Sequence, residues 1–197
     1  MRRVTHDGLR WSNGEDDRIE IADYDPAWPT RFADEAAALR NVLPPDLDVA
    51  IEHFGSTAIA GLAAKPIIDI MLIVPARSRW SELVEPVQSL GYVHWGENPA
   101  PHHMFFVKGM PPFGTGRTHH VHVHRPEEAS ASIRFRDYLI AHPDEAARYA
   151  ALKRELAQRF RTDRDAYTNH KAAFVAEILA KTVEGGAASP PGSAGVG

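Results

Sequence analysis

Cysteine is absent from this 197-residue sequence. Its absence excludes disulfide cross-links, thiolate zinc sites and cysteine nucleophiles. Long apolar runs are also lacking, because none reaches the roughly 18 residues of a membrane-spanning helix, so we expect no membrane partner. The first stretch, MRRVTHDGLRWSNGEDDR, has no apolar segment of the kind that secretory signals carry. We therefore expect a cytoplasmic location.

An excess of one charge is missing as well. The chain has 22 Lys and Arg against 26 Asp and Glu, a net charge of -4. Such a balance produces no overall field that attracts nucleic acid or an acidic membrane, so there is no strong case for a nucleic-acid partner. The unusual count is histidine, with 11.

The two ends of the chain differ in composition from the rest. Residues 1–17 are polar and without periodicity, which predicts a disordered arm. Residues 184–197, EGGAASPPGSAGVG, are too poor in large apolar side chains to pack a core, which predicts a disordered tail. The body between them, residues 18–183, is long enough for a single domain with a core of its own.

Within the body, the apolar residues follow two periods. Alternation or short apolar runs predict strands at 18–24, 48–54, 67–74, 92–96, 103–109 and 118–124. Helical spacing predicts helices at about 26–43, opened by Asp25-Pro26, and at 80–90, 130–141, 143–160 and 163–181. This order predicts an α+β fold: a mixed β-sheet flanked by helices, with a helical C-terminal block.

An aspartate stands inside the most apolar strand, IIDIMLIV. An ionised Asp69 there is costly unless something pairs with it. Gly55-Ser56 ends the preceding strand and is either an ordinary turn or a cradle for phosphate oxygens. The 12 residues between Ser56 and Asp69 allow both to reach the same end of the sheet. Asp69 is then a ligand of Mg²⁺ beside substrate phosphates or the partner of a Lys or Arg.

The strand THHVHVH carries three histidines spaced by two. Because side chains alternate along a strand, His120, His122 and His124 share one face. Such a row presents imidazoles to a metal, or it is the polar side of a half-exposed strand. For His124, next to Arg125-Pro126, we favour the polar position. We expect His120 and His122 to lie on the same side of the sheet as Asp69.

Lys171 falls in the middle of an apolar helical stripe formed by Tyr167, Phe174 and Ile178. A lysine there either extends its amine to an edge or reaches a buried anion. We expect the amine to lie at the Gly55/Ser56 end of the sheet and to pair with a carboxylate when no ligand is bound.

Other charged residues lie close to these elements in the sequence. Glu52 is the carboxylate nearest to Gly55. The further cations, each of which is alternatively a solvated surface charge, are Lys65, Arg117, Arg134 and Arg136.

Several motifs together resemble the GrpB family: EHFGSTAIAGLAAKPIIDI, RTHHVHV, FRDYL, YAALKRELAQRF and DRDAYTNHKAAF. The resemblance spans about Asp23 to Lys181. GrpB-like proteins are placed in the nucleotidyltransferase superfamily, so the resemblance implies a nucleotidyltransferase-like mixed sheet with flanking helices. The signature of that superfamily is Gly-Ser, a spacer, and then Asp-x-Asp or Asp-x-Glu on the next strand. Gly55-Ser56 and Asp69 match it.

The second acidic position of that signature is Met71 in this chain. Two Mg²⁺ ions about 3.5–4 Å apart, the arrangement usual in nucleotidyl transfer, need more carboxylate than Asp69 alone. The resemblance makes the histidine strand the counterpart of the one that supplies a third carboxylate. It therefore implies an altered metal site built from Glu52, Asp69, His120 and His122, which favours Mn²⁺ or Zn²⁺ over Mg²⁺.

Residues and resemblance together predict an enzyme that uses a nucleoside triphosphate and a divalent metal (Mg, Mn or Zn). It would transfer a nucleotidyl or related group to a small-molecule acceptor. The residues expected to act are, for metal, Asp69, Glu52 and His122; for phosphate, Gly55, Ser56, Lys65, Arg136 and Lys171; and for catalysis, Asp69, Lys171 and His120, the last as a base. The alternatives are a catalytically silent nucleotide-binding regulatory module and a metal-dependent enzyme of different chemistry that uses the histidines and no nucleotide.

Overall fold

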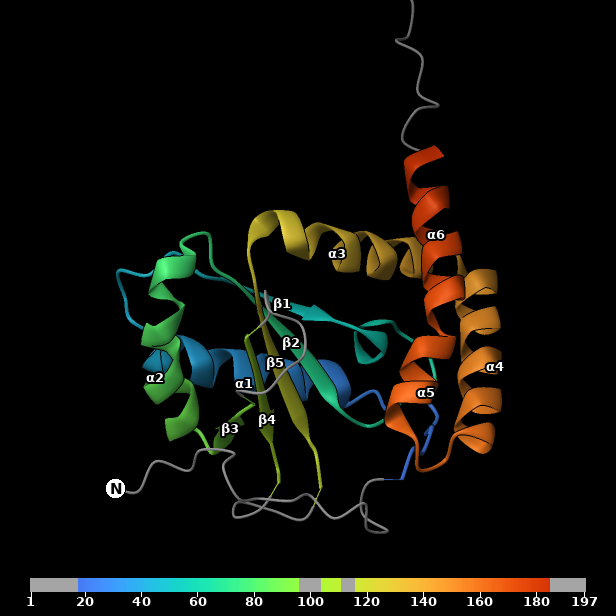
Figure 1. The fold of residues 1–197 in the computed structure, drawn as a ribbon, viewed down its shortest axis with the longest axis horizontal. Coiled ribbons are helices and arrows are strands. Elements are labelled where there is room, and N and C mark those ends of the chain that lie inside the picture. Colours follow the sequence, from blue (N-terminus) through green and yellow to red (C-terminus); the bar gives the residue numbers. More distant parts are fainter. Residues whose placement is uncertain (1–17, 96–103, 111–115, 185–197) are drawn as a thin grey trace, which may run out of the picture.

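The computed structural model describes residues 18–95, 104–110 and 116–184 (Figure 1). Its first half holds α1 (Trp28–Val42), β1 (Ala50–Phe54), the short 3₁₀ helix η2 (Ser56–Ala58), β2 (Ile68–Ile73), the 3₁₀ helix η3 (Arg77–Leu83), α2 (Val84–Ser89) and β3 (Tyr92–His94). The second half holds β4 (Met104–Lys108), β5 (His119–His124), α3 (Pro126–Ala141), α4 (Pro143–Arg159), α5 (Arg164–His170) and α6 (Ala172–Glu184).

The five strands form one mixed sheet in the order β1-β2-β5-β4-β3. β2 pairs with β5 in parallel, and all other neighbours are antiparallel. The predicted α+β class, a mixed sheet flanked by helices with a helical C-terminal block, is confirmed. The parallel pair at the centre matters most, because it places the aspartate strand directly beside the histidine strand.

One face of the sheet packs on α1 and α2. Its central residues are Ile68, Ile70 and Leu72 of β2 and Val121 and Val123 of β5, all at most 2% exposed. They meet Trp28 and Leu39 of α1 and Val87 of α2, among other side chains of the same core cluster. Burial of this face fixes the register, because a slip of one residue would turn every apolar side chain to the opposite face.

The C-terminal helices α4, α5 and α6 stand together beside the sheet, at the right of Figure 1. A second core cluster joins them to the segment that follows β1. Ile59 and Leu62 of that segment pack with Tyr149, Phe174 and Ile178 of the helices. The helices are thereby fixed next to the turn at Gly55.

Several predicted boundaries were wrong. Residues 18–24 form no strand beyond an isolated bridge between Ala22 and Ala64. The first helix begins at Trp28, because the Asp25 carboxylate accepts a hydrogen bond from the Ala27 amide in the turn before it. The helix expected at 80–90 starts as η3, and the one expected at 130 starts at Pro126. The helix expected at 163–181 is broken at Lys171 into α5 and α6.

The ends of the chain were predicted to be disordered. The predicted arm, residues 1–17, lies outside the described residues, as does the tail from residue 185 onward. Glu184, the first residue of the predicted tail, is the last residue of α6. Within the described ranges, no helix is both long enough and apolar enough to cross a membrane.

Candidate functional site

The turn after β1 brings backbone and carboxylate into close contact. Phe54, the last residue of β1, is paired with Asp69 of β2. Gly55 follows with φ +70°, in the left-handed region that favours glycine. A Cβ at this position would lie 2.5 Å from Oδ2 of Asp69. Glycine is therefore required here for two reasons, its φ and the space that the Asp69 carboxylate occupies.

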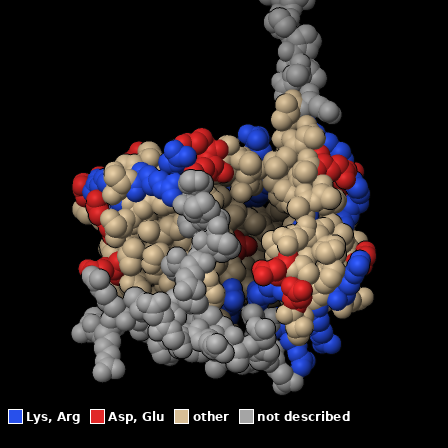
Figure 2. Space-filling view, viewed as in Figure 1, with Lys and Arg blue, Asp and Glu red and all other residues tan. Residues whose placement is uncertain are grey.

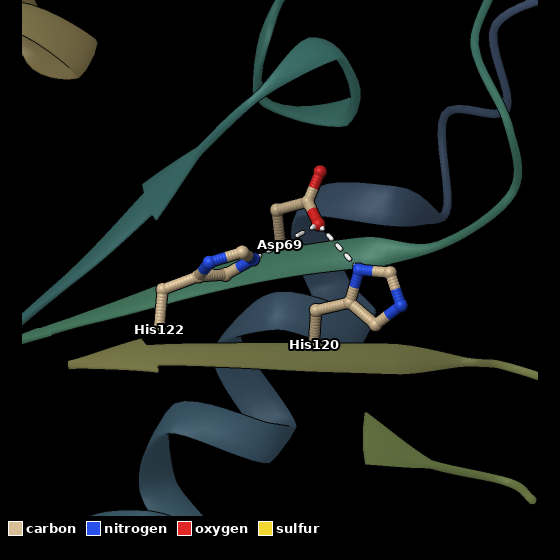
Figure 3. A group of neighbouring side chains, drawn as sticks. All are labelled: Asp69, His120 and His122. Carbon is tan, nitrogen blue, oxygen red and sulfur yellow. Dashed lines mark hydrogen bonds and ion pairs between the residues drawn. The ribbon is translucent and has the colours of Figure 1, made fainter. Parts of the chain in front are cut away.

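Two histidines of β5 converge on the same carboxylate. In the parallel register, Asp69 is paired with His120 and Met71 with His122. Figure 3 shows both rings turned toward one oxygen of Asp69. His120 Nδ1 lies 3.1 Å from Asp69 Oδ1, and His122 Nε2 lies 3.8 Å from it. The prediction that both histidines share the side of Asp69 is confirmed.

The protonation states follow from burial and these contacts. Burial alone would raise the pKa of Asp69, but the hydrogen bond from His120 and the nearby His122 ring hold that pKa far below its usual range. Burial lowers the pKa of His120 to about 4, against the opposing effect of Asp69. At neutral pH the carboxylate is therefore ionised and His120 is neutral. Metal ligands are bound in these forms.

The donor atoms of Asp69, His120 and His122 fit a metal ion. One atom from each lies within 4.8 Å of the other two. Donors bound at about 2.0–2.2 Å to one tetrahedral ion lie roughly 3–3.5 Å apart, which small side-chain rotations would reach. The buried Nε2 of His120 has no hydrogen-bond partner among the described residues, a feature that marks where a ligand or water completes a site. Two imidazoles and one carboxylate suit a transition metal such as Mn²⁺ or Zn²⁺ better than Mg²⁺.

Two predicted members of the site lie elsewhere. Arg136 of α3 donates to the Glu52 carboxylate at 2.9 Å and to the His53 carbonyl at 2.7 Å. Glu52 therefore has a cationic partner of its own, and it does not belong to the group of metal-ligand atoms. Met71, at the second acidic position, is fully buried. Neither Glu52 nor Met71 therefore supplies a second carboxylate beside Asp69.

A cavity of about 570 Å³ opens onto the Asp69 group. Figure 2 shows the molecule hollowed between the sheet and the C-terminal helices, with Lys and Arg side chains at the rim. Five cations line the cavity: Lys65, Arg117, Lys153, Arg164 and Lys171. The carboxylates that line it are Asp69 and Asp165, and Ser56, Phe54, Phe105, Trp95 and Tyr167 also contribute. Arg134, a predicted cation, is exposed and lines a separate depression between α3 and α6.

Lys65 and Lys171 approach the same aromatic ring. Their amines lie 4.9 and 4.5 Å from the centroid of Tyr167, so they are at most about 9.4 Å apart. Two ammonium groups at that distance repel by roughly 2 kcal/mol at an effective dielectric constant of 20. Lys171 lies at the predicted end of the sheet, because it lines the same cavity as Ser56 and Asp69. The predicted pairing with a carboxylate was wrong, because no carboxylate among the described residues forms an ion pair with it; its amine lies over Tyr167 instead.

Lys153 of α4 is a cavity residue that the sequence analysis missed. Its side chain is 2% exposed. The amine donates to the Ala63 carbonyl at 2.5 Å and lies 4.7 Å from the centroid of Tyr149. The signal was present in the sequence, because Lys153 lies between Tyr149, Ala150, Leu156 and Ala157 on the buried side of α4. This is the same pattern that singled out Lys171.

Burial and like charge weaken the proton affinity of these lysines. The pKa of Lys153 is lowered to about 7 by burial and then by neighbouring cations, with Lys171 first among them. The pKa of Lys65 is lowered to about 7 by burial and by Arg164 and Lys171. Burial also lowers the pKa of Lys171. An anion bound beside these three lysines would offset their burial and mutual repulsion and raise their pKa values again.

Comparison with known proteins finds a matching family model, a similar protein sequence and a similar crystal structure. A model of the family described as GrpB protein matches residues 18–181. The UPF0157 protein PA4798 of Pseudomonas aeruginosa is 55% identical over 178 residues, which is 90% of this chain and 73% of that protein. The crystal structure of the conserved protein GrpB from Enterococcus faecalis aligns with a TM-score of 0.74 and 34% identity, covering 84% of this chain and 98% of that chain.

A weaker likeness extends to a polymerase. A crystal structure of the Cid1 poly(U) polymerase bound to MgATP aligns over 71% of this chain and 45% of that chain, with 14% identity and a TM-score of 0.49. A score below 0.5 carries no conclusion about function.

Proposed function

This chain belongs to the GrpB family, and we propose that it is a metal-dependent enzyme that binds a nucleoside triphosphate. In this proposal it transfers a nucleotidyl or related group to a small-molecule acceptor. One observation carries the proposal: a single cavity is lined by a transition-metal donor set at Asp69, His120 and His122 and by five cations. Metal and polyphosphate are the two ligands that nucleotidyl transfer brings together.

The charge of the cavity favours a polyanion. Five cationic side chains face two carboxylates there. Among the described residues, no carboxylate forms an ion pair with Lys65, Lys153 or Lys171. Unpaired amines in a partly buried cavity cost stability, and such cost is typical of sites kept for binding. A triphosphate would neutralise them.

In this proposal, each of the site residues has a role that follows from its position. Asp69, His120 and His122 would hold the metal, which would polarise a phosphoryl oxygen when bound. Gly55, whose φ of +70° opens the turn, and Ser56, which lines the cavity, would hold a phosphate through backbone N–H groups and the hydroxyl. Lys65 and Lys171 would stabilise charge that develops on the transferring group.

Three roles expected from the sequence are not kept. His120 is better placed as a metal ligand than as a base, because its Nδ1 faces Asp69 and the ring belongs to the group of candidate ligand atoms. Glu52 and Arg136 pair with each other and do not line the cavity.

Binding and turnover test the proposal together. Thermal unfolding would be recorded with ATP, GTP and CTP, each alone and with Mg²⁺, Mn²⁺ or Zn²⁺. We expect the largest stabilisation with a nucleotide and Mn²⁺ or Zn²⁺ together. Pyrophosphate release from the stabilising pair, in the presence of a pool of small hydroxyl and amine acceptors, would then be assayed. The proposal fails if no nucleotide stabilises the protein under any of these conditions.

Met71 favours a second candidate, a catalytically silent nucleotide-binding module. A fully buried methionine at the second acidic position leaves one carboxylate where two-metal catalysis needs more. Nucleotide stabilisation without any pyrophosphate release would indicate this module. Stabilisation by metal alone would instead indicate an enzyme of different chemistry built on Asp69 and the two histidines.

A further inference from the structure

Three lysines from three separate segments meet in the cavity. Lys65 precedes β2, Lys153 lies in α4, and Lys171 lies at the break between α5 and α6. Lys65 and Lys171 share the Tyr167 ring, and Lys153 lies over Tyr149. The three amines contact aromatic rings and one backbone carbonyl, whereas buried ammonium groups would be expected to pair with carboxylates.

Lys153 differs from the other two in depth. It is 2% exposed, whereas Lys65 and Lys171 are half-buried. An ammonium has three N–H donors, and among the described residues the one protein acceptor that Lys153 contacts is the Ala63 carbonyl. Lys153 also lines the cavity, so a ligand that reaches it would accept from its other N–H groups.

We propose that Lys65, Lys153 and Lys171 form a polyphosphate-binding site that holds at least two linked phosphates without a metal, and that Lys153 selects for chain length. A single phosphate satisfies the two outer lysines and leaves Lys153 without an anionic partner. A longer chain also reaches Lys153 and neutralises all three amines. The location of this site within a nucleotide cavity rests on the proposed function, but its binding chemistry does not.

The lowered pKa values agree with this arrangement. Lys65 and Lys153 have pKa values of about 7 because of burial and neighbouring cations. Anions beside the amines would favour their protonated forms. The site would therefore gain positive charge as it is filled.

The test uses simple anions and the full chain in excess EDTA. Binding of inorganic phosphate, pyrophosphate, tripolyphosphate and ATP would be measured by isothermal titration calorimetry. We expect affinity to rise with chain length from phosphate to tripolyphosphate. If ATP binds more tightly than tripolyphosphate, the natural ligand is a nucleotide; if tripolyphosphate binds more tightly, it is a free polyphosphate chain.

Two variants separate chain-length selection from general charge. Lys153→Met should weaken tripolyphosphate binding roughly 10- to 100-fold, the range of a charged hydrogen bond, and change phosphate binding less than threefold. Lys171→Met should weaken both. Arg159→Met, on the exposed side of the same helix α4, is the matched control and should leave both unchanged.

The outcomes separate this proposal from the proposed function. Metal-free tripolyphosphate binding that Lys153→Met weakens supports the site, even if no nucleotide is ever turned over. The inference is overturned if tripolyphosphate does not bind in EDTA, if phosphate binds as tightly, or if Lys153→Met and Arg159→Met behave alike. Circular dichroism of each variant would show that it is folded.

Discussion

Lys153→Met should make the ligand-free protein more stable at pH 7. Methionine keeps the length of the buried stem and removes an amine that is 2% exposed. Lowering the lysine pKa from 10.5 to about 7 costs roughly 4–5 kcal/mol at 1.36 kcal/mol per pKa unit. The hydrogen bond to Ala63 returns about 1.5–3 kcal/mol and the Tyr149 ring about 0.5–2 kcal/mol. Taken at mid-range, these terms leave a gain of roughly 1 kcal/mol for the variant.

The gain should depend on pH in a defined direction. The pKa of Lys153 is lower in the folded than in the unfolded chain, so the folded state binds fewer protons between about pH 7 and 10.5. Stability therefore rises with pH in this window, and the wild type should gain roughly 2 kcal/mol from Lys153 between pH 7 and 9. Lys65, with a pKa also lowered to about 7, contributes to the same slope in both proteins. The advantage of Lys153→Met should shrink or vanish by pH 9.

Thermal and urea unfolding at pH 7, 8 and 9 would measure this. The variant should melt roughly 2–4 °C higher at pH 7, given about 2–4 °C per kcal/mol for a domain of this size. Arg159→Met controls for the loss of a positive charge from α4. If Lys153→Met is less stable than the wild type at pH 7, or if the difference between them does not change with pH, then Lys153 is not a destabilised buried cation.

Further variants test the metal group, the turn and the ion pair outside the cavity. Asp69→Asn should fold but lose the stabilisation that Mn²⁺ or Zn²⁺ gives, because a neutral amide is a poor ligand; a metal-induced shift equal to that of the wild type would place the metal elsewhere. Gly55→Ala should lose roughly 1–3 kcal/mol of stability, since its Cβ would lie 2.5 Å from Asp69 Oδ2 and its φ is +70°; urea unfolding that matches the wild type would contradict this. Arg136→Met should also lose roughly 1–3 kcal/mol through its bonds to Glu52 and His53. Its tripolyphosphate affinity should stay unchanged, and a tenfold loss would return Arg136 to the site.

Sequence patterns within single strands and turns determined several structural features of this protein. The period of two along THHVHVH places His120 and His122 on one face, whatever the strand pairs with. The apolar run around Asp69 identifies a central strand and makes its carboxylate conspicuous. The turn at Gly55 follows from residue type, because only glycine readily adopts φ +70°. The strand that carries Asp69 and the shared face of the two histidines were predictable for these reasons.

Contacts between distant segments were decided by the tertiary structure alone. The parallel register that sets His120 beside Asp69 joins residues 51 positions apart. The ion pair that removes Glu52 from the metal group joins it to Arg136, 84 positions away. Lys153 becomes a cavity residue because α4 packs against the segment at Ala63, 90 positions earlier. Periodicity reports which side of an element is buried, whereas the partner of a charged group depends on how elements are packed in space.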